Sequence, residues 1–205
     1  MDLPAPMFPS RRRIPLFAEP GWVYEPKLNG YRIIAGVDRG IVQLVTQRGA
    51  DAATWFPEVV VVLASLSGGP HVLDGAMCVF DNLGRSNLRL LQDRARRRRW
   101  YDGAEPVEFC AFDLLVHDGR ALLNQPLEER KRKLIEVLSP VQAAVRCIDH
   151  LDAEQGRALL ERATELHLKG LVAKRLGSQY QAGLRSPDWR NVRRNDASRL
   201  ESFKR

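Results

Sequence analysis

One lysine of this sequence stands in a setting that suits covalent chemistry. Lys27 lies in the segment "YEPKLNGYR", behind a proline and ahead of Asn29 and Gly30, with Arg32 five residues downstream. A free lysine, with a pKa of about 10.4, is almost wholly protonated at neutral pH, so a nucleophilic lysine needs nearby cations or burial to lower its pKa. The structural alternative is a β-hairpin, because Asn-Gly between apolar runs is typical of a hairpin turn. The segment alone leaves both interpretations open.

The charge of the chain favours a phosphate-rich partner. Its 205 residues include 32 Lys+Arg and 25 Asp+Glu, which gives a formal net charge of +7. Such an excess biases a domain toward nucleic acids and nucleotides. The excess is concentrated in two segments, the arginine run of 93–100 and the C-terminal stretch 189–205. The candidate nucleic-acid contacts of the run are Arg94, Arg96, Arg97, Arg98 and Arg99. For an isolated run, a solvated helix end is an equally good interpretation.

The elements that position these residues alternate irregularly between strands and helices. We expect strands at 21–28, 31–38, 41–49, 71–81, 107–119, 170–178 and 188–194. We expect helices at 53–66, 88–99, 126–138 and 152–169, the last with Asp152 as its N-cap. Short connections with turn dipeptides favour antiparallel sheets that carry helices, an α+β arrangement. Asp74-Gly75 and Asp113 can be interpreted as turn and strand-end residues.

The sequence contains nothing that indicates a membrane or a secretory route. No apolar run reaches the roughly 18 residues of a membrane span. The first residues, "MDLPAPMFPSRRR", do not have the apolar core of a secretory signal. Three cysteines are odd in number and widely spaced, so they define neither a disulfide framework nor a zinc site. We therefore expect a cytoplasmic protein without membrane partners.

Seven segments in order carry a family resemblance: "EPKLNGYR", "VTQRG", "FPEV", "VLDGAMCVFD", "FCAFDLL", "KGLVAKR" and "SPDWRNVRR". Together they resemble the nucleotidyltransferase motifs of ATP-dependent DNA ligases, most of all the ligase domain of bacterial end-joining ligases. The resemblance covers about residues 6–194, which makes 1–205 one adenylation domain. It implies two antiparallel β-sheets flanked by helices, with a nucleotide groove between them. The C-terminal OB-fold domain of active ligases is expected to be absent from this chain.

The resemblance also implies a role for individual residues. Lys27 would be the catalytic nucleophile that takes AMP from ATP. The other nucleotide-binding residues that it implies are Glu25, Pro26, Arg32, Arg48, Phe112, Lys174 and Arg193. The backbone at Glu25 and Pro26 would meet the adenine edge and Phe112 the adenine face. Arg32 and Arg48 would lie near the ribose and phosphates, and Lys174 would lie on the α-phosphate.

Several positions depart from the family. Its members carry aspartate where this chain has Asn29, and glutamate where it has Ala76 and Lys169; they usually carry lysine at Asn191 and Arg193. The family's cofactors are ATP and Mg²⁺, and Mg²⁺ prefers carboxylate ligands. We therefore expect no metal ligands among the protein's own residues at these positions. A fixed cation at position 169 would instead lower the pKa of Lys27.

Two functions follow from this combination. The first is an ATP-dependent DNA ligase-like enzyme of DNA repair and recombination. It would form a lysyl-AMP at Lys27 and act on nicked or broken duplex DNA, and a partner protein would supply the OB domain. Its activity would be weakened by the lost carboxylates. The alternative is a catalytically impaired pseudo-ligase that binds nucleotide or DNA. A relative that acts on RNA ends or caps fits less well, since "EPKLNGYR" and "FDLL" look more like DNA ligases.

Overall fold

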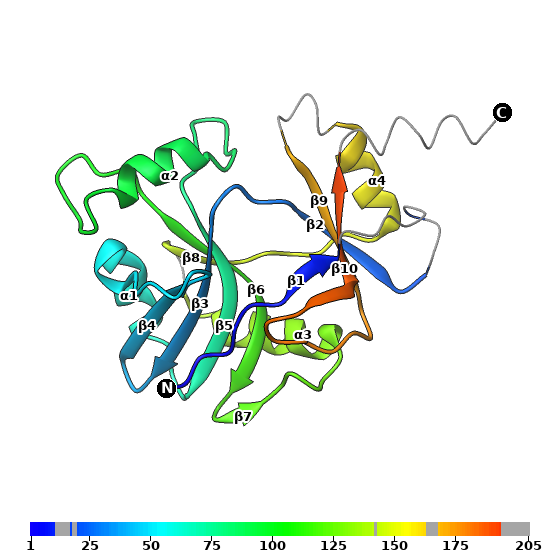
Figure 1. The fold of residues 1–205 in the computed structure, drawn as a ribbon, viewed down its shortest axis with the longest axis horizontal. Coiled ribbons are helices and arrows are strands. Elements are labelled where there is room, and N and C mark those ends of the chain that lie inside the picture. The colour runs from blue at the N-terminus through cyan, green and yellow to red at the C-terminus, as the bar shows by residue number, and fades with distance from the viewer. Residues whose placement is uncertain (11–16, 18–19, 142, 163–167, 194–205) are drawn as a thin grey trace.

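The computed structural model describes residues 1–10, 17, 20–141, 143–162 and 168–193, and the account below refers to these. The chain forms two β-sheets that carry helices, as Figure 1 shows, with the larger sheet on the left and the smaller on the right. This is the α+β class with two sheets that the sequence predicted.

The strands are β1 (Phe8–Ser10), β2 (Trp22–Pro26), β3 (Tyr31–Asp38), β4 (Ile41–Thr46), β5 (His71–Cys78), β6 (Glu108–His117), β7 (Arg120–Ala121), β8 (Val145–Cys147), β9 (Gly170–Arg175) and β10 (Arg185–Arg193). The helices are the 3₁₀ turn η1 (Ala53–Trp55), α1 (Pro57–Ala64), α2 (Leu88–Ala95), α3 (Leu127–Leu138) and α4 (Ala153–Glu161). The smaller sheet has the strand order β1-β10-β9-β2. The larger sheet has the order β4-β3-β5-β6-β7, with β8 beside β6. Neighbouring strands are antiparallel except for the parallel pairs β1–β10 and β6–β8, and the sequence predicted neither β1 nor β8.

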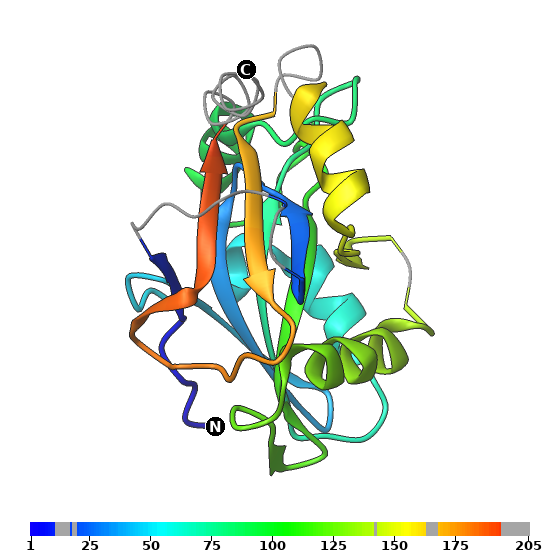
Figure 2. The same ribbon diagram turned by 90° about the vertical axis from the view of Figure 1, so that its right-hand side faces the viewer.

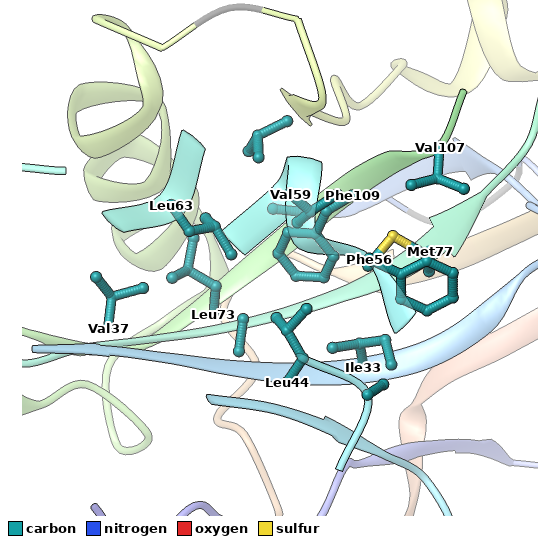
Figure 3. Close-up of a cluster of buried hydrophobic side chains, with 14 of the residues drawn as sticks. Ile33, Val37, Leu44, Phe56, Val59, Leu63, Leu73, Met77, Val107 and Phe109 are labelled. Carbon is teal, nitrogen blue, oxygen red and sulfur yellow. The ribbon is translucent and has the colours of Figure 1, made fainter. Parts of the chain in front are cut away.

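Helices cover the outer face of each sheet, and the inner faces meet. Helices α1, α2 and α3 pack on the larger sheet over a core that includes Phe56, Leu63 and Phe109 (Figure 3). Helix α4 lies against the smaller sheet (Figure 2). Leu160 of this helix belongs to the same buried cluster as Tyr24 of β2. A third apolar cluster joins the two sheets from the inside. Its members are Met7, Ile34, Val72, Ala76, Cys78, Cys110, Phe112, Leu115, Tyr180 and Trp189.

The alternation of strand side chains decides which residues face the inside. Successive residues of a strand point to opposite faces. On β9, Leu171 and Ala173 pack under α4, so Val172 and Lys174 face the other sheet. The same parity brings the odd-numbered residues of β2 and β10, and the even-numbered residues of β3 and β5, to the space between the sheets.

Asn29-Gly30 is not a hairpin turn, so the structural alternative for this segment is wrong. Strand β2 pairs with β9 in the smaller sheet, whereas β3 lies in the larger sheet between β4 and β5. The segment from Lys27 to Gly30 therefore crosses from one sheet to the other. A Cβ at position 30 would lie 2.2 Å from the carbonyl oxygen of Met77, so only glycine fits this crossing.

Other expectations needed smaller corrections. Asp74-Gly75 lies inside β5 rather than in a turn. The helix expected at 53–66 divides into η1 and α1, and the one expected at 88–99 ends at Ala95. Asp152 caps α4 with a capping box to Gln155 as expected, and residues 163–167 of the longer helix predicted there lie outside the described residues. Within the described ranges, no helix has the length and apolar character needed to cross a membrane.

Candidate active site

A cavity of about 320 Å³ lies between the two sheets. It is lined by Pro9, Glu25, Pro26, Lys27, Leu28, Gly30, Arg32, Gln47, Ala76, Phe112, Ile148, Val172, Lys174, Trp189 and Asn191. The lining comes from β1, β2, β3, β5, β6, β9 and β10, from the crossing segment, and from the residues that follow β4 and β8. Six of the eight catalytic or nucleotide-binding residues expected from the sequence lie here, namely Glu25, Pro26, Lys27, Arg32, Phe112 and Lys174.

Lys27 follows β2 directly and is half-buried in this cavity. Its backbone N–H donates to the carbonyl oxygen of Gly170 at 3.0 Å, so the edge of β9 fixes its position. Burial lowers the pKa of the Lys27 amine, and the positive charges of Arg193 and Lys169 lower it further. All three influences favour the neutral amine, which is the form that can act as a nucleophile.

Glu25 is held between two lysines. Its carboxylate lies 2.8 Å from Nζ of Lys131 and 2.6 Å from Nζ of Lys174, and all three side chains are almost completely buried. Lys131 comes from α3 and also donates to the carbonyl oxygen of Ile148 at 2.9 Å. Although burial opposes its charge, attraction to Lys174 and Lys131 lowers the pKa of Glu25. The group is therefore an ionised carboxylate between two cations.

Lys174 lies in the apolar part of the cavity. Its Nζ is 4.3 Å from the ring centroid of Phe112 and 4.2 Å from that of Trp189. Burial is the main reason that the pKa of Lys174 is lowered to about 8, with repulsion from Lys131 opposing the attraction of Glu25. Arg32 also lies 4.5 Å from the Phe112 ring centroid. The Phe112 ring is thus in contact with two cations.

Arg32 forms an ion pair with the buried carboxylate of Asp74. Its Nε and Nη2 each lie 2.5 Å from an oxygen of Asp74, and Nη2 donates to the carbonyl oxygen of Met7 at 3.1 Å. The hydroxyl of Tyr180 donates to the same Asp74 carboxylate at 2.6 Å. Burial opposes the charge of Arg32, but attraction to Asp74 outweighs it and raises the pKa of the guanidinium. Asp74, interpreted from the sequence as a turn residue, is therefore the anchor of Arg32.

Asn29, Ala76 and Lys169, the three positions at which the family resemblance implied carboxylates, lie in different settings. The Asn29 amide Nδ2 donates to the carbonyl oxygen of Ser86 at 3.3 Å, and its backbone N–H donates to Ser86 Oγ at 2.9 Å. Ala76 lines the cavity, and Lys169 is exposed. Among the described lining residues the one carboxylate is Glu25, which the two lysines neutralise. This donor set does not fit a protein-bound Mg²⁺.

A second group of metal-ligand types lies at the start of β5. The ligand atoms of His71, His117 and Asp118 lie within 4.8 Å of one another. His71 Nε2 contacts the carbonyl oxygen of Ser67 at 3.0 Å, and Asp118 accepts from the Gly69 N–H at 2.8 Å. These bonds explain the group as a stabiliser of the turn before β5.

The remaining candidate residues lie outside the cavity. Arg48 lines a neighbouring pocket, and Arg193 is at the end of β10. The arginine run divides: Arg96 to Arg99 are exposed, but Arg94 is fully buried. Arg94 Nη2 donates to both oxygens of Glu58, at 2.9 and 3.1 Å. Arg94 is therefore a structural residue and not part of a basic surface, which corrects its assignment as a nucleic-acid contact.

Sequence reasoning missed three residues of this site. Lys131 lies on α3 and was not singled out in the sequence, because its contact with Glu25 depends on tertiary packing. Trp189 and Tyr180 meet the site from β10 and from the loop before it. The alternation of side chains along the strand "SPDWRNVRR" could have indicated Trp189, since it places Trp189 on the same face as Asn191 and Arg193.

A half-buried lysine in a groove lined by cations suits a phosphate-bearing ligand, and comparison with known proteins defines the class. The model of the family described as "ATP dependent DNA ligase domain" matches residues 10–192. The chain belongs to this family of ATP-dependent DNA ligase nucleotidyltransferase domains, whose members use ATP.

Individual relatives agree with this assignment. The "Multifunctional non-homologous end joining protein LigD" of Pseudomonas aeruginosa is 36% identical over 168 residues, which is 82% of this chain and 19% of that protein. The LigD of Mycobacterium tuberculosis H37Rv is 33% identical over 185 residues, which is 90% of this chain and 23% of that protein. The chain thus spans about a fifth of the length of these relatives.

Solved structures give the same result for the fold. A structure of mycobacterial DNA ligase D complexed with ATP and MES has a TM-score of 0.75 and 32% identity, and the match covers 93% of this chain and 60% of that one. Chlorella virus DNA ligase-adenylate, at 12% identity and a TM-score of 0.64, is similar in fold.

Proposed function

We propose that this domain binds ATP in the groove between the sheets and forms a covalent lysyl-AMP at Lys27, as the first step of DNA strand joining in break repair. One observation carries the proposal. Lys27 is half-buried in the cavity, and burial together with Arg193 and Lys169 lowers the pKa of its amine.

The reaction places specific demands on the groove. The Lys27 Nζ lone pair attacks the α-phosphorus of ATP and a P–N bond forms. The bond from that phosphorus to the bridging oxygen breaks, pyrophosphate leaves with the electron pair, and the lysine proton passes to solvent. Charge develops on the phosphate oxygens, so catalysis of this kind depends on positioning and on nearby cations. Lys169, Lys174 and Arg193 are the cations that we assign to this role.

We propose that Lys174 changes its partner when ATP binds. In the structure its ammonium contacts Phe112 and the Glu25 carboxylate. Adenine can stack on this face of Phe112 only if the ammonium leaves it. Movement toward the α-phosphate would exchange Glu25 for a stronger anionic partner, while Lys131 would remain to neutralise Glu25.

No step of this proposal passes through a protein-bound metal. The family positions for metal-binding carboxylates are Asn29, Ala76 and Lys169 here. We propose that Lys169 and Arg193 supply positive charge at the place where the family uses an acidic residue. The activity would then be weaker than that of members with all three carboxylates, since one transition-state charge contact is worth about 100- to 1000-fold in rate.

DNA is the proposed acceptor of the AMP. The LigD proteins of Pseudomonas aeruginosa and Mycobacterium tuberculosis are named for non-homologous end joining. We propose that the exposed arginines at 96–99, of which Arg96 pairs with Asp93, and Arg48 contact backbone phosphates. Binding through such contacts falls steeply with salt and depends little on sequence.

Covalent labelling tests the proposal. The protein is incubated with α-labelled ATP and magnesium and then denatured, and covalent label is measured on a gel. We expect label on the parent protein and on Lys133→Ala, whose lysine lies outside the cavity lining, and none on Lys27→Ala. If the parent protein binds ATP but takes no label at millimolar ATP, the chain is a nucleotide-binding pseudo-ligase and the proposal is wrong.

A further inference from the structure

Four residues from separate parts of the chain form a closed ring of hydrogen bonds beside the nucleotide groove. The Met7 N–H donates to the Tyr180 hydroxyl at 2.8 Å, and that hydroxyl donates to Asp74 Oδ2 at 2.6 Å. Arg32 donates to both oxygens of Asp74, and its Nη2 also donates to the carbonyl oxygen of Met7. Met7, Asp74 and Tyr180 are buried, and Arg32 is the member of the ring that lines the groove.

The Tyr180 hydroxyl closes this ring because it both donates and accepts a hydrogen bond. Burial raises the pKa of the hydroxyl and the charge of Asp74 raises it further, so the proton stays on the phenol oxygen and is donated to the carboxylate. The lone pairs of the same oxygen accept from the Met7 N–H. Burial also raises the pKa of Asp74, and the bonds from Arg32 and Tyr180 act against this. Tyr180 therefore helps to keep Asp74 ionised, which is the form that Arg32 binds.

The ring leaves one nitrogen of Arg32 for a ligand. Nε and Nη2 bond within the ring, and Nη1 has no hydrogen-bond partner in the part of the chain that the structure describes. The guanidinium is planar, so fixing the edge that carries Nε and Nη2 also fixes the direction of Nη1. The same guanidinium lies 4.5 Å from the ring centroid of Phe112 and 5.6 Å from that of Trp189, and both rings line the groove. Nη1 is thus positioned before a nucleotide arrives, which reduces the ordering cost of binding.

We propose that Tyr180 is a positioning residue of the nucleotide site, which through Asp74 holds Arg32 so that Nη1 donates to an anionic oxygen of the nucleotide. The segment that contains Met7 takes part, because its N–H and its carbonyl oxygen close the ring on both sides. Tyr180 itself does not line the groove, so its effect on the nucleotide passes through Arg32. The inference rests on the proposed function, which places ATP in this groove.

Binding of an ATP analogue that cannot transfer AMP tests this assignment without the chemical step. α,β-Methylene-ATP has a carbon in place of the bridging oxygen, and its affinity is measured by isothermal titration calorimetry with magnesium present. Arg32→Lys still offers a positive charge to Asp74 but has no planar guanidinium, so we expect it to bind the analogue about 10- to 100-fold more weakly. Tyr180→Phe should bind it about 10-fold more weakly, because part of the same contact is lost. In the Arg32→Lys background, Tyr180→Phe should change the affinity by less than about twofold, since the guanidinium through which it acts is gone.

Tyr24→Phe is the matched control for Tyr180→Phe. The Tyr24 hydroxyl also accepts a bond from a backbone N–H, that of Phe17 at 3.1 Å, and Tyr24 is buried outside the lining of the groove. Both variants keep the aromatic ring, so Tyr180→Phe keeps its edge-on contact with Trp189. We expect the two variants to lose similar stability in urea unfolding, and only Tyr180→Phe to lose affinity for the analogue.

Two results would overturn the proposal. Equal affinities for the analogue in Tyr180→Phe and Tyr24→Phe would make Tyr180 a purely structural residue. A loss of affinity in Tyr180→Phe that persists in the Arg32→Lys background would show that Tyr180 does not act through Arg32. Neither result bears on labelling at Lys27, which is scored separately. The expected affinities in a parent protein that takes no label would contradict the adenylation proposal and support this one.

Discussion

The stability of the Glu25 network provides a sharp test of the electrostatics of the site. In the folded protein two buried lysines, Lys131 and Lys174, share the one carboxylate of Glu25. Glu25→Gln keeps the size of the side chain but leaves two buried cations without a counter-charge. Removing one partner of a buried ion pair costs about 3–5 kcal/mol. Because glutamine can still accept one hydrogen bond, we expect the lower half of that range.

Lys131→Met should cost less, and the order of the two variants is the informative result. Without Lys131, Glu25 and Lys174 remain as a neutral pair. The main loss is the bond to the carbonyl oxygen of Ile148, and one unsatisfied buried group costs about 1–3 kcal/mol. In the double variant Glu25→Gln/Lys131→Met one cation remains instead of two. The double variant should therefore lose less stability than the sum of the single variants.

Urea unfolding, monitored by tryptophan fluorescence, measures these differences in the free energy of unfolding. Unchanged m-values are the check on two-state behaviour. The loss of unfolding free energy in Glu25→Gln, relative to the parent protein, should also become smaller as pH rises from 7 to 9. In the folded parent the pKa of Lys174 is lowered to about 8, and loss of the attraction of Glu25 lowers it further in the variant. Across that interval the folded variant therefore binds fewer protons than the folded parent, and it gains more stability as pH rises. A cost below about 1 kcal/mol for Glu25→Gln, or a larger cost for Lys131→Met, would refute the reasoning.

Three further outcomes are expected. Gly30→Ala should lower stability by about 1–3 kcal/mol or more in a thermal-shift assay, because its Cβ would lie 2.2 Å from the Met77 carbonyl oxygen. The rate of self-adenylation should rise with pH until the Lys27 amine is neutral. Lys169→Gln removes a nearby cation and so raises the pKa of Lys27, which should move this rise in rate to higher pH. Arg94→Met should lower stability by about 1.5–3 kcal/mol in urea, since Glu58 loses a charge-assisted partner.

Matched controls exist for each of these variants. Gly177→Ala is the control for Gly30→Ala, because a Cβ at 177 meets nothing within 4 Å. Lys133→Gln is the control for Lys169→Gln, because it removes a cation outside the cavity. Arg97→Met is the control for Arg94→Met, because it changes an exposed arginine of the same run. A control that behaves like its partner variant would show that the stated contact is not the cause.

The sequence predicted the strands and helices well where local patterns decide them. The helix at 126–138 was expected from apolar spacing and acidic residues in its first turn, and α3 spans Leu127–Leu138. Asp152 was expected as an N-cap, and its carboxylate accepts from the Gln155 N–H at 2.8 Å. These features depend on neighbours within one helical turn, so a single sequence contains them.

Features that depend on distant pairing were not predictable in this way. Asn29-Gly30 has the local pattern of a hairpin, yet β2 pairs with β9, more than 140 residues away, so the chain crosses between sheets instead. No local pattern distinguishes Lys131 from the other polar residues of its helix, and its contact with Glu25 depends on the packing of α3 against β6. Arg94 looked like its neighbours in the run, and only the position of Glu58 separates it from them.

The most direct test of the central claim is the site of the adenylyl group. The protein is incubated with ATP and magnesium, digested, and mapped by mass spectrometry before and after addition of pyrophosphate. Our account predicts AMP on the peptide that contains Lys27 and its removal by pyrophosphate, since the P–N bond forms reversibly. AMP on another residue, or an unmodified Lys27 at saturating ATP, would contradict it.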